Sequence, residues 1–236
     1  MVVNSAPAPA PESLAPEIED VLARYQTATE KQRKSMLGVQ MEMDIDGRFT
    51  KLQETGRMRG LRTISKLGEL TWKTIDFTGD NRVKNELIAR FVGQEEKDKA
   101  YGAMILTPQD YEFKLGAVLK DGDQTIYQFD VKPRKNAPGR IKGEIWIDGK
   151  TGMPLREAGI LVKSPSVWLT NLRFTRDYEL RDGVSIVKSF KSSTDVRLLG
   201  VGRAELDVDF KNFSRIDQAA ASQGSTLAAS VRNSGF

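Results

Sequence analysis

The chain has 236 residues, with 36 Lys or Arg against 32 Asp or Glu, and a formal net charge of +4. It contains neither cysteine nor histidine, which excludes disulfides, Cys or His zinc ligands and Ser-His-Asp triads within this chain. Basic and acidic residues alternate instead of clustering, which is typical of a solvated surface, so we expect no nucleic-acid partner. No apolar run approaches the ~20 residues of a membrane-spanning helix, so we expect no transmembrane segment.

The two ends of the chain differ in composition from the middle. Residues 1–12 contain an alternating Ala/Pro tract, which predicts a flexible leader, and residues 214–236 are rich in Ser, Ala and Gly, which predicts a low-complexity tail. Residues 13–213 are expected to form a single β domain. The leader lacks a charged segment followed by an apolar one, and we expect an exported, periplasmic chain whose signal peptide is not present in this sequence. The alternative is a cytosolic protein.

Two segments have the periodicity of amphipathic helices. Apolar residues recur at helical spacing over residues 13–36, where Pro16 is tolerated in the first turn. A second helix is predicted over residues 82–99. Its apolar face consists of Val83, Leu87, Ile88, Phe91 and Val92.

Most of the remaining chain alternates apolar and polar residues. Residues 39–49, 141–148, 172–180 and 203–210 each have one polar face, which is typical of antiparallel strands. Asp-Gly pairs such as Asp182-Gly183 predict hairpin turns. We count about seven strands in residues 111–213 and two or three in residues 38–77. So many strands predict a mainly β protein with some α structure (α+β), as a barrel, a half-barrel or a strongly curved sheet.

Carboxylate clusters are the main candidates for chemistry in a chain without His or Cys. Residues 42–47 resemble part of a calcium-binding loop, but a strand with one wet face explains every residue there. Glu205, Asp207 and Asp209 have the spacing of paired catalytic carboxylates, yet the alternation places them on a solvated face. We therefore predict no enzyme, no metal and no cofactor. An enzyme that uses carboxylates alone is the weaker rival.

Several motifs carry a family resemblance. Residues 143–148 (Gly-Glu-Ile-Trp-Ile-Asp) and 151–156 (Thr-Gly-Met-Pro-Leu-Arg) resemble a strand–turn–strand segment of the outer-membrane lipoprotein-sorting-like (LolA/LolB-like) superfamily. The first strand at residues 38–43 and the hairpin at residues 177–184 agree with a diverged member. The resemblance implies an unclosed, strongly curved antiparallel sheet, or half-barrel, covered by an N-terminal helix and an inserted helix. It also implies an apolar cavity for acyl chains of lipoproteins or lipids.

The apolar strand faces supply the candidate lining of that cavity, and methionines among them would adapt to an irregular apolar ligand. The competing interpretation is ordinary core packing. The predicted lining residues are Met41, Met43, Ile45, Ile145, Ile147, Leu172, Phe174, Leu206 and Val208, with Trp72 and Trp168 at the mouth. We predict a monomeric, non-catalytic carrier, with an envelope protein as a further partner. The alternative is a cell-envelope module that binds protein or glycan through exposed sheet faces or edges.

Overall fold

The computed structural model describes residues 11–97, 106–163, 169–181, 183–196 and 202–216. Ten strands lie in this part of the chain: β1 (Val39–Phe49), β2 (Glu54–Ile64), β3 (Leu70–Gly79), β4 (Tyr111–Asp121), β5 (Gln124–Pro133), β6 (Ile141–Asp148), β7 (Pro154–Leu161), β8 (Leu169–Arg181), β9 (Val184–Val196) and β10 (Gly202–Arg215). They form one sheet with the order β3-β2-β1-β10-β9-β8-β7-β6-β5-β4. Each strand pairs antiparallel with its neighbours, and β3 and β4 are the two edges.

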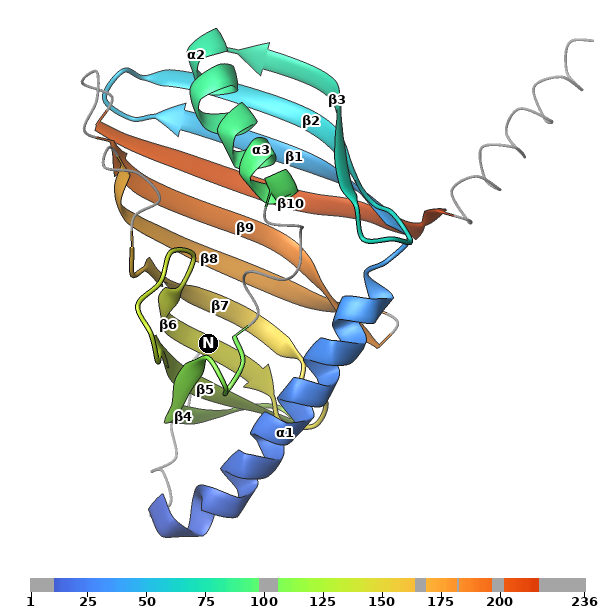
Figure 1. Cartoon of the computed structure of the whole chain (residues 1–236), viewed down its shortest axis with the longest axis vertical. Coiled ribbons are helices and arrows are strands. Elements are labelled where there is room, and N and C mark those ends of the chain that lie inside the picture. The colour runs from blue at the N-terminus through green and yellow to red at the C-terminus, as the bar shows by residue number, and fades with distance from the viewer. Residues whose placement is uncertain (1–10, 98–105, 164–168, 182, 197–201, 217–236) are drawn as a thin grey trace, which may run out of the picture.

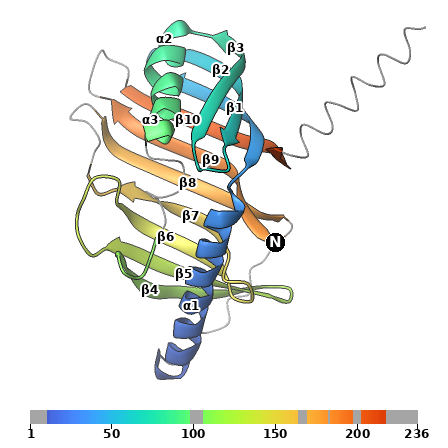
Figure 2. The same cartoon turned by 45° about the vertical axis from the view of Figure 1, so that its right-hand side comes forward.

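The sheet is curved and unclosed, and helices cover its inner face (Figures 1 and 2). The predicted fold class is therefore confirmed. β1 shows why the sequence folds this way: its odd-numbered residues are buried, while the intervening residues are exposed or part-buried. Period two is the geometry of a strand with one face on the core. We call the helix-covered face the inner face and the opposite one the outer face.

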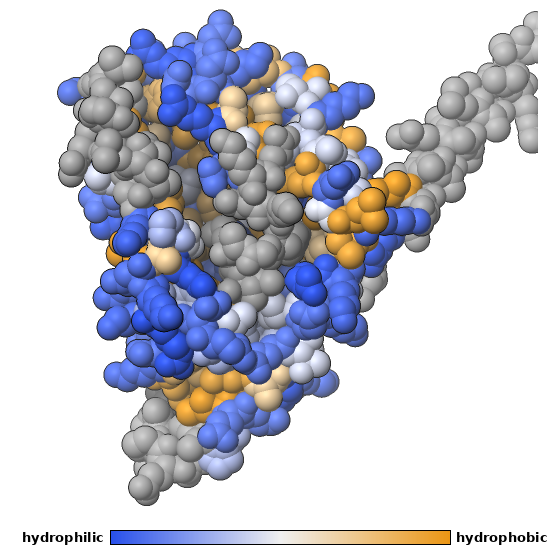
Figure 3. All heavy atoms as spheres, viewed as in Figure 1, coloured by the Kyte–Doolittle hydropathy of each residue, from blue (hydrophilic) through white to orange (hydrophobic). Residues whose placement is uncertain are grey.

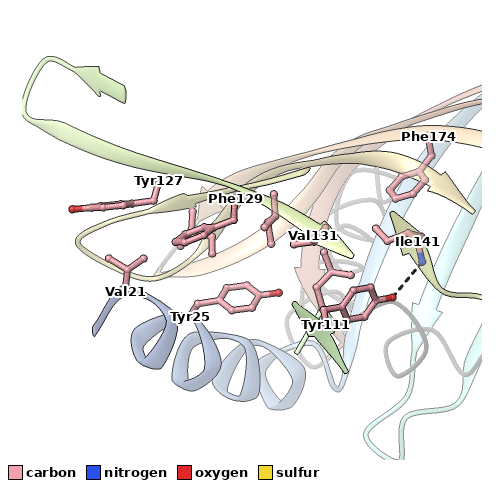
Figure 4. Close-up of a cluster of buried hydrophobic side chains, with 11 residues drawn as sticks. Val21, Tyr25, Tyr111, Tyr127, Phe129, Val131, Ile141 and Phe174 are labelled. Atoms are coloured by element: carbon pink, nitrogen blue, oxygen red, sulfur yellow. Dashed lines mark hydrogen bonds between the residues drawn. The ribbon is translucent and has the colours of Figure 1, made fainter. Parts of the chain in front are cut away.

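The N-terminal helix α1 (Pro11–Ser35) lies across the half of the sheet that contains β4 to β7 (Figures 1 and 2). Its apolar stripe includes Val21 and Tyr25, which are fully buried against Phe129 and its neighbours. Figure 4 shows Val21 and Tyr25 of the helix directed at side chains of the strands. In the same cluster the backbone N–H of Ile141 donates to the Tyr111 hydroxyl at 3.3 Å. Hydrophobic burial thus fixes α1 on this half of the sheet.

A second helical segment covers the other half of the sheet. It is continuous over residues 81–97 and consists of α2 (Asn81–Val83), the π-helical turn η1 (Lys84–Ile88) and α3 (Ala89–Lys97); we call it the inserted helix. Its closest approach to the sheet is made at glycines of β1 and β2. A Cβ at Gly47 would lie 2.8 Å from Val83 Cγ1, and one at Gly56 would lie 3.1 Å from the same atom.

The element bounds differ slightly from the prediction. α1 begins at Pro11, and β10 continues to Arg215, inside the predicted tail. The inserted helix ends at Lys97, and the last two residues of the predicted helix over 82–99 lie outside the described residues. None of the helices in the described ranges is both long enough and apolar enough to cross a membrane.

Candidate functional site

Eight of the eleven predicted lining residues are buried on the inner face. Ile145, Ile147 and Phe174 belong to the cluster beneath α1, which we call the α1 cluster. Those beneath the inserted helix, in what we call the insertion cluster, are Met43, Ile45, Leu206 and Val208. Met41 lies in a third cluster, next to Met36 and Val39 where α1 leads into β1. The sequence therefore predicts one shared face, which the structure divides among three packed groups.

The other three predicted residues differ. Leu172 is part-buried, and Trp72 is a part-buried member of the insertion cluster. Trp168 lies outside the described residues. The role of all eleven residues in ligand binding stays a prediction.

Phe190 of β9 joins the two large clusters, since it packs against both. Its ring stacks on Phe174 of β8 at a centroid distance of 6.2 Å, and on Phe91 of α3 at 5.7 Å. The three aromatic rings thus make one apolar path from the α1 cluster to the inserted helix. The sequence analysis missed Phe190, although it shares the phase of Ile186 in the same strand, because Lys188 interrupts the alternation.

A buried ion pair adjoins this aromatic path. Arg176 Nη1 of β8 lies 3.2 Å from Glu157 Oε2 of β7 and donates to the Tyr178 hydroxyl at 3.4 Å. The Arg176 guanidinium also lies 5.7 Å from the Phe190 ring centroid. Burial raises the pKa of Glu157, and Arg176 opposes that rise. Burial, together with the Glu157 charge, also raises the pKa of Tyr25 well above its ordinary value.

A second buried cation lies beneath the other half of the inner face. Arg62 of β2 is only 4% exposed, and its guanidinium carbon lies 5.7 Å from the centroid of the Trp72 ring. Arg62 Nη1 also approaches Met41 Sδ at 3.9 Å. The Nε1 atom of Trp72 is buried and makes no hydrogen bond within the structure. We call these two residues the Arg62–Trp72 corner.

Two pockets lie among the described residues. A pocket of about 10 Å³, no larger than one water molecule, is lined by Met41, Ile186, Phe210 and Phe213 together with polar residues of β8 to β10. A larger pocket of about 240 Å³ is lined mainly by polar side chains of β1 and β2, with Ile75 and Lys211. Figure 3 shows hydrophobic residues in patches between hydrophilic residues on the face of the molecule that Figure 1 views.

The outer face holds the carboxylates considered for catalysis. Asp44 accepts from Lys211 Nζ at 2.7 Å and lies 3.4 Å from Arg57 Nη2. The hydrogen bond from Lys211 is the main cause that lowers the pKa of Asp44. Asp207 and Asp209 are exposed, as the alternation predicts. In the described part of the chain, no three acidic side chains are arranged to hold a metal ion.

Comparisons with known proteins give similarity at the level of the fold. No family model matches the chain, and no curated protein matches its sequence. The structure is similar to a LolA superfamily protein from Nitrosomonas europaea, with 13% identity and a TM-score of 0.43 over 83% of this chain and 92% of that chain. It is also similar to a putative outer membrane lipoprotein-sorting protein domain from Vibrio parahaemolyticus, with 11% identity and a TM-score of 0.38 over 80% and 92%.

A third similar structure is a DUF1329 family protein from Desulfovibrio piger, with 11% identity and a TM-score of 0.40 over 83% of this chain and 93% of that chain.

Proposed function

We propose that this chain is a non-catalytic periplasmic carrier that binds acyl chains of a lipid or lipoprotein on its inner face. One observation carries the proposal: the aromatic path through Phe174, Phe190 and Phe91 joins two apolar clusters beneath two separate helices. The core of a protein that only has to fold does not require a helix that can move away from the sheet. Here the insertion cluster is a sheet surface whose cover is a single helical segment.

The energetics allow such a ligand to replace the cover. Each buried methylene contributes about 0.8 kcal/mol, and micromolar affinity requires about 8 kcal/mol after the entropic cost of association. An acyl chain of 12 to 16 carbons supplies about 10 to 13 kcal/mol before that entropic cost when it is fully buried. The ligand would take the contacts that Val83, Ile88 and Phe91 make in the structure described here. Release would follow when the inserted helix returns or when a partner offers a better apolar site.

The direct test is native mass spectrometry of the purified protein, followed by organic extraction and lipid analysis. Acyl species that co-purify in near-stoichiometric amounts would support the carrier and identify the ligand class. A clean apo mass together with no uptake of a fluorescent fatty acid would contradict it.

A pair of variants ties the uptake to the inner face. Phe174→Asp places a charge where the two clusters meet, and we expect it to abolish uptake of the fluorescent fatty acid, because the carboxylate must stay solvated. Asp207→Ala changes the exposed outer face and should leave uptake unchanged. Circular dichroism and urea titration establish whether Phe174→Asp is folded. A folded Phe174→Asp protein that binds the fluorescent fatty acid as well as wild type would contradict acyl binding on the inner face.

The unclosed sheet favours a second candidate function. Because β3 and β4 each have a neighbour on one side, they are edges to which an extended peptide can add as a further strand. The ion-paired outer face offers charged groups for an envelope protein or glycan. An interaction module of this kind would show salt-sensitive binding and would carry no lipid through purification.

A further inference from the structure

The indole N–H of Trp72 is a buried hydrogen-bond donor that has no acceptor among the described residues. Buried donors are nearly always paired, and an unpaired one costs about as much as a lost hydrogen bond. Trp72 is part-buried as a residue, so its ring is at the border of the packed interior. An unpaired donor at such a border is a position where a ligand oxygen can replace water.

A permanent positive charge lies beside this donor. The Arg62 guanidinium stacks over the Trp72 ring at 5.7 Å. The Arg62 side chain is buried: Met41 Sδ lies 3.9 Å from Nη1, and Met58 and Ile64 are buried on the same face of β2. In such low-dielectric surroundings a cation strengthens the attraction for a negatively polarised oxygen.

The corner adjoins the apolar surface that is proposed to bind the acyl chain. Trp72 packs against the insertion cluster, which contains Met43, Ile45 and Val208. Met41, beside Arg62, belongs to the neighbouring cluster at the start of β1. A ligand that lies along the insertion cluster therefore has its polar end within reach of the corner.

We infer that the Arg62–Trp72 corner binds the polar end of the acyl ligand, where a carboxylate or ester carbonyl oxygen accepts the Trp72 indole hydrogen bond beside the Arg62 charge. This inference rests on the proposed function, because it requires that an acyl chain occupies the inner face. It adds a chemical preference: ligands with an acceptor oxygen at the head of the chain bind more tightly than an alkane of the same length.

The chain provides a matched pair of tryptophans for the test. Trp146 of β6 also lies beneath an arginine, Arg156, whose guanidinium carbon is 5.7 Å from the ring centroid. Its strand neighbours Ile145 and Ile147 are buried on the inner face, so Trp146 belongs to the outer face. Trp72→Phe and Trp146→Phe each keep an aromatic ring beneath the guanidinium and remove the indole N–H.

The experiment compares displacement of a bound fluorescent fatty acid by dodecanoic acid, methyl dodecanoate and dodecane. We expect Trp72→Phe to weaken binding of dodecanoic acid by about five-fold, the effect of one hydrogen bond, and to leave dodecane unchanged. Trp146→Phe should leave all three unchanged. If Trp72→Phe weakens the binding of dodecanoic acid alone, the acceptor is a carboxylate. If it weakens the binding of both the acid and the methyl ester, the acceptor is a carbonyl oxygen. Both results support the inference.

The outcomes that overturn the inference differ from those that overturn the proposed function. If wild type binds none of the three ligands, the proposed function fails. Suppose that wild type binds them, but Trp72→Phe binds all three as tightly as wild type, or its affinity for dodecane falls as much as its affinity for the acid. The Arg62–Trp72 corner then contributes packing and no hydrogen bond to the ligand. A second readout uses the three indole N–H signals in a ¹⁵N spectrum, where the Trp72 signal is the one missing from Trp72→Phe. That signal should move on addition of dodecanoic acid and stay in place on addition of dodecane; no movement with the acid also overturns the inference.

Discussion

The two helical covers of the inner face are held in different ways. α1 is fixed along its length by polar contacts to the sheet: Arg24 donates to the Gly149 carbonyl, and Gln32 donates to the Ser185 carbonyl. Near the start of the helix, the Tyr127 hydroxyl donates to Glu17. Burial, together with this hydrogen bond, raises the pKa of Tyr127 to about 12. Directional contacts at both ends fix the register of α1 in a way that apolar packing alone does not.

Polar contacts hold the beginning of the inserted helix. The Asp80 carboxylate accepts from the Thr55 N–H at 2.8 Å, and the Asp80 N–H donates to the Thr55 carbonyl at 2.7 Å. Arg82 pairs with Glu54 at 3.6 Å, and Lys84 lies over the Phe77 ring at 4.9 Å. Further along, Ile88 and Phe91 contact the sheet through apolar atoms. α1 is thus held by polar contacts at both of its ends, whereas the contacts described for the inserted helix are polar at residues 80–84 and apolar at Ile88 and Phe91.

The largest effect should come from breaking the buried pair that lies beside α1. Arg176→Leu leaves Glu157 buried without its cation, which we expect to lower the free energy of unfolding by about 3 to 5 kcal/mol in urea titrations. The double variant Glu157→Leu with Arg176→Leu should recover most of that loss, because two apolar side chains replace both charges. A double variant no more stable than the single one would show that the pair is not the cause.

A smaller effect separates the two helices directly. A Cβ at Gly152 would lie 2.4 Å from the backbone carbonyl carbon of Arg24 in α1, and Gly152 has a φ of +71°. Gly152→Ala should therefore cost roughly 2 to 4 kcal/mol of unfolding free energy, since neither backbone can yield.

Its counterpart on the inserted side is Gly47→Ala, whose Cβ would meet the Val83 side chain at 2.8 Å. A helix that can shift reduces this strain, so we expect a loss of only about 1 kcal/mol. Amide hydrogen exchange should also rise in the inserted helix of Gly47→Ala and remain low in α1. A Gly47→Ala protein as unstable as Gly152→Ala would contradict the difference between the two covers.

The fold could be predicted because its signals are local. Period-two alternation and helical spacing identify the elements within about ten residues of sequence, and the strand count follows from them. The predicted face was wrong at individual positions within the strands. The pattern over residues 172–180 places Leu180 on the apolar face, yet it is 54% exposed. The register between β8 and β9 also shifts between Asp177 and Tyr178, and such a bulge leaves no clear mark in a single sequence.

The polar part of the candidate site was missed for a different reason. Arg62 occupies the apolar phase of β2, between Met58 and Ile64, and Arg176 occupies the phase of Phe174 in β8. A charged residue at a strand position where the alternation expects an apolar one is either exposed to solvent there or buried beside a partner of opposite or polar character. The choice depends on which side chain lies opposite in the paired strand, such as Glu157 of β7 opposite Arg176, and the alternation within one strand does not give the register of that pairing.

The smallest effect concerns the pH dependence of stability, which should separate the inner and outer faces. The pKa of Glu157 is raised above its ordinary value of 4.5 by burial, so the folded protein binds its proton more tightly than the unfolded chain. Its contribution to stability is full below pH 4.5 and is lost as the pH rises through the raised pKa. Asp44 behaves in the opposite way, because Lys211 lowers its pKa: its contribution is present above 3.8 and is lost as the pH falls through the lowered pKa.

Urea titrations at a series of pH values test this division. Glu157→Gln should flatten the decline in stability above pH 4.5 and leave the acid side of the profile unchanged, whereas Asp44→Asn should change the acid side alone. If Glu157→Gln leaves the decline above pH 4.5 intact, the Glu157 carboxyl does not titrate within the folded protein in that range. Arg176 then keeps Glu157 ionised, and the inner face contains a permanently charged pair beside the proposed acyl site.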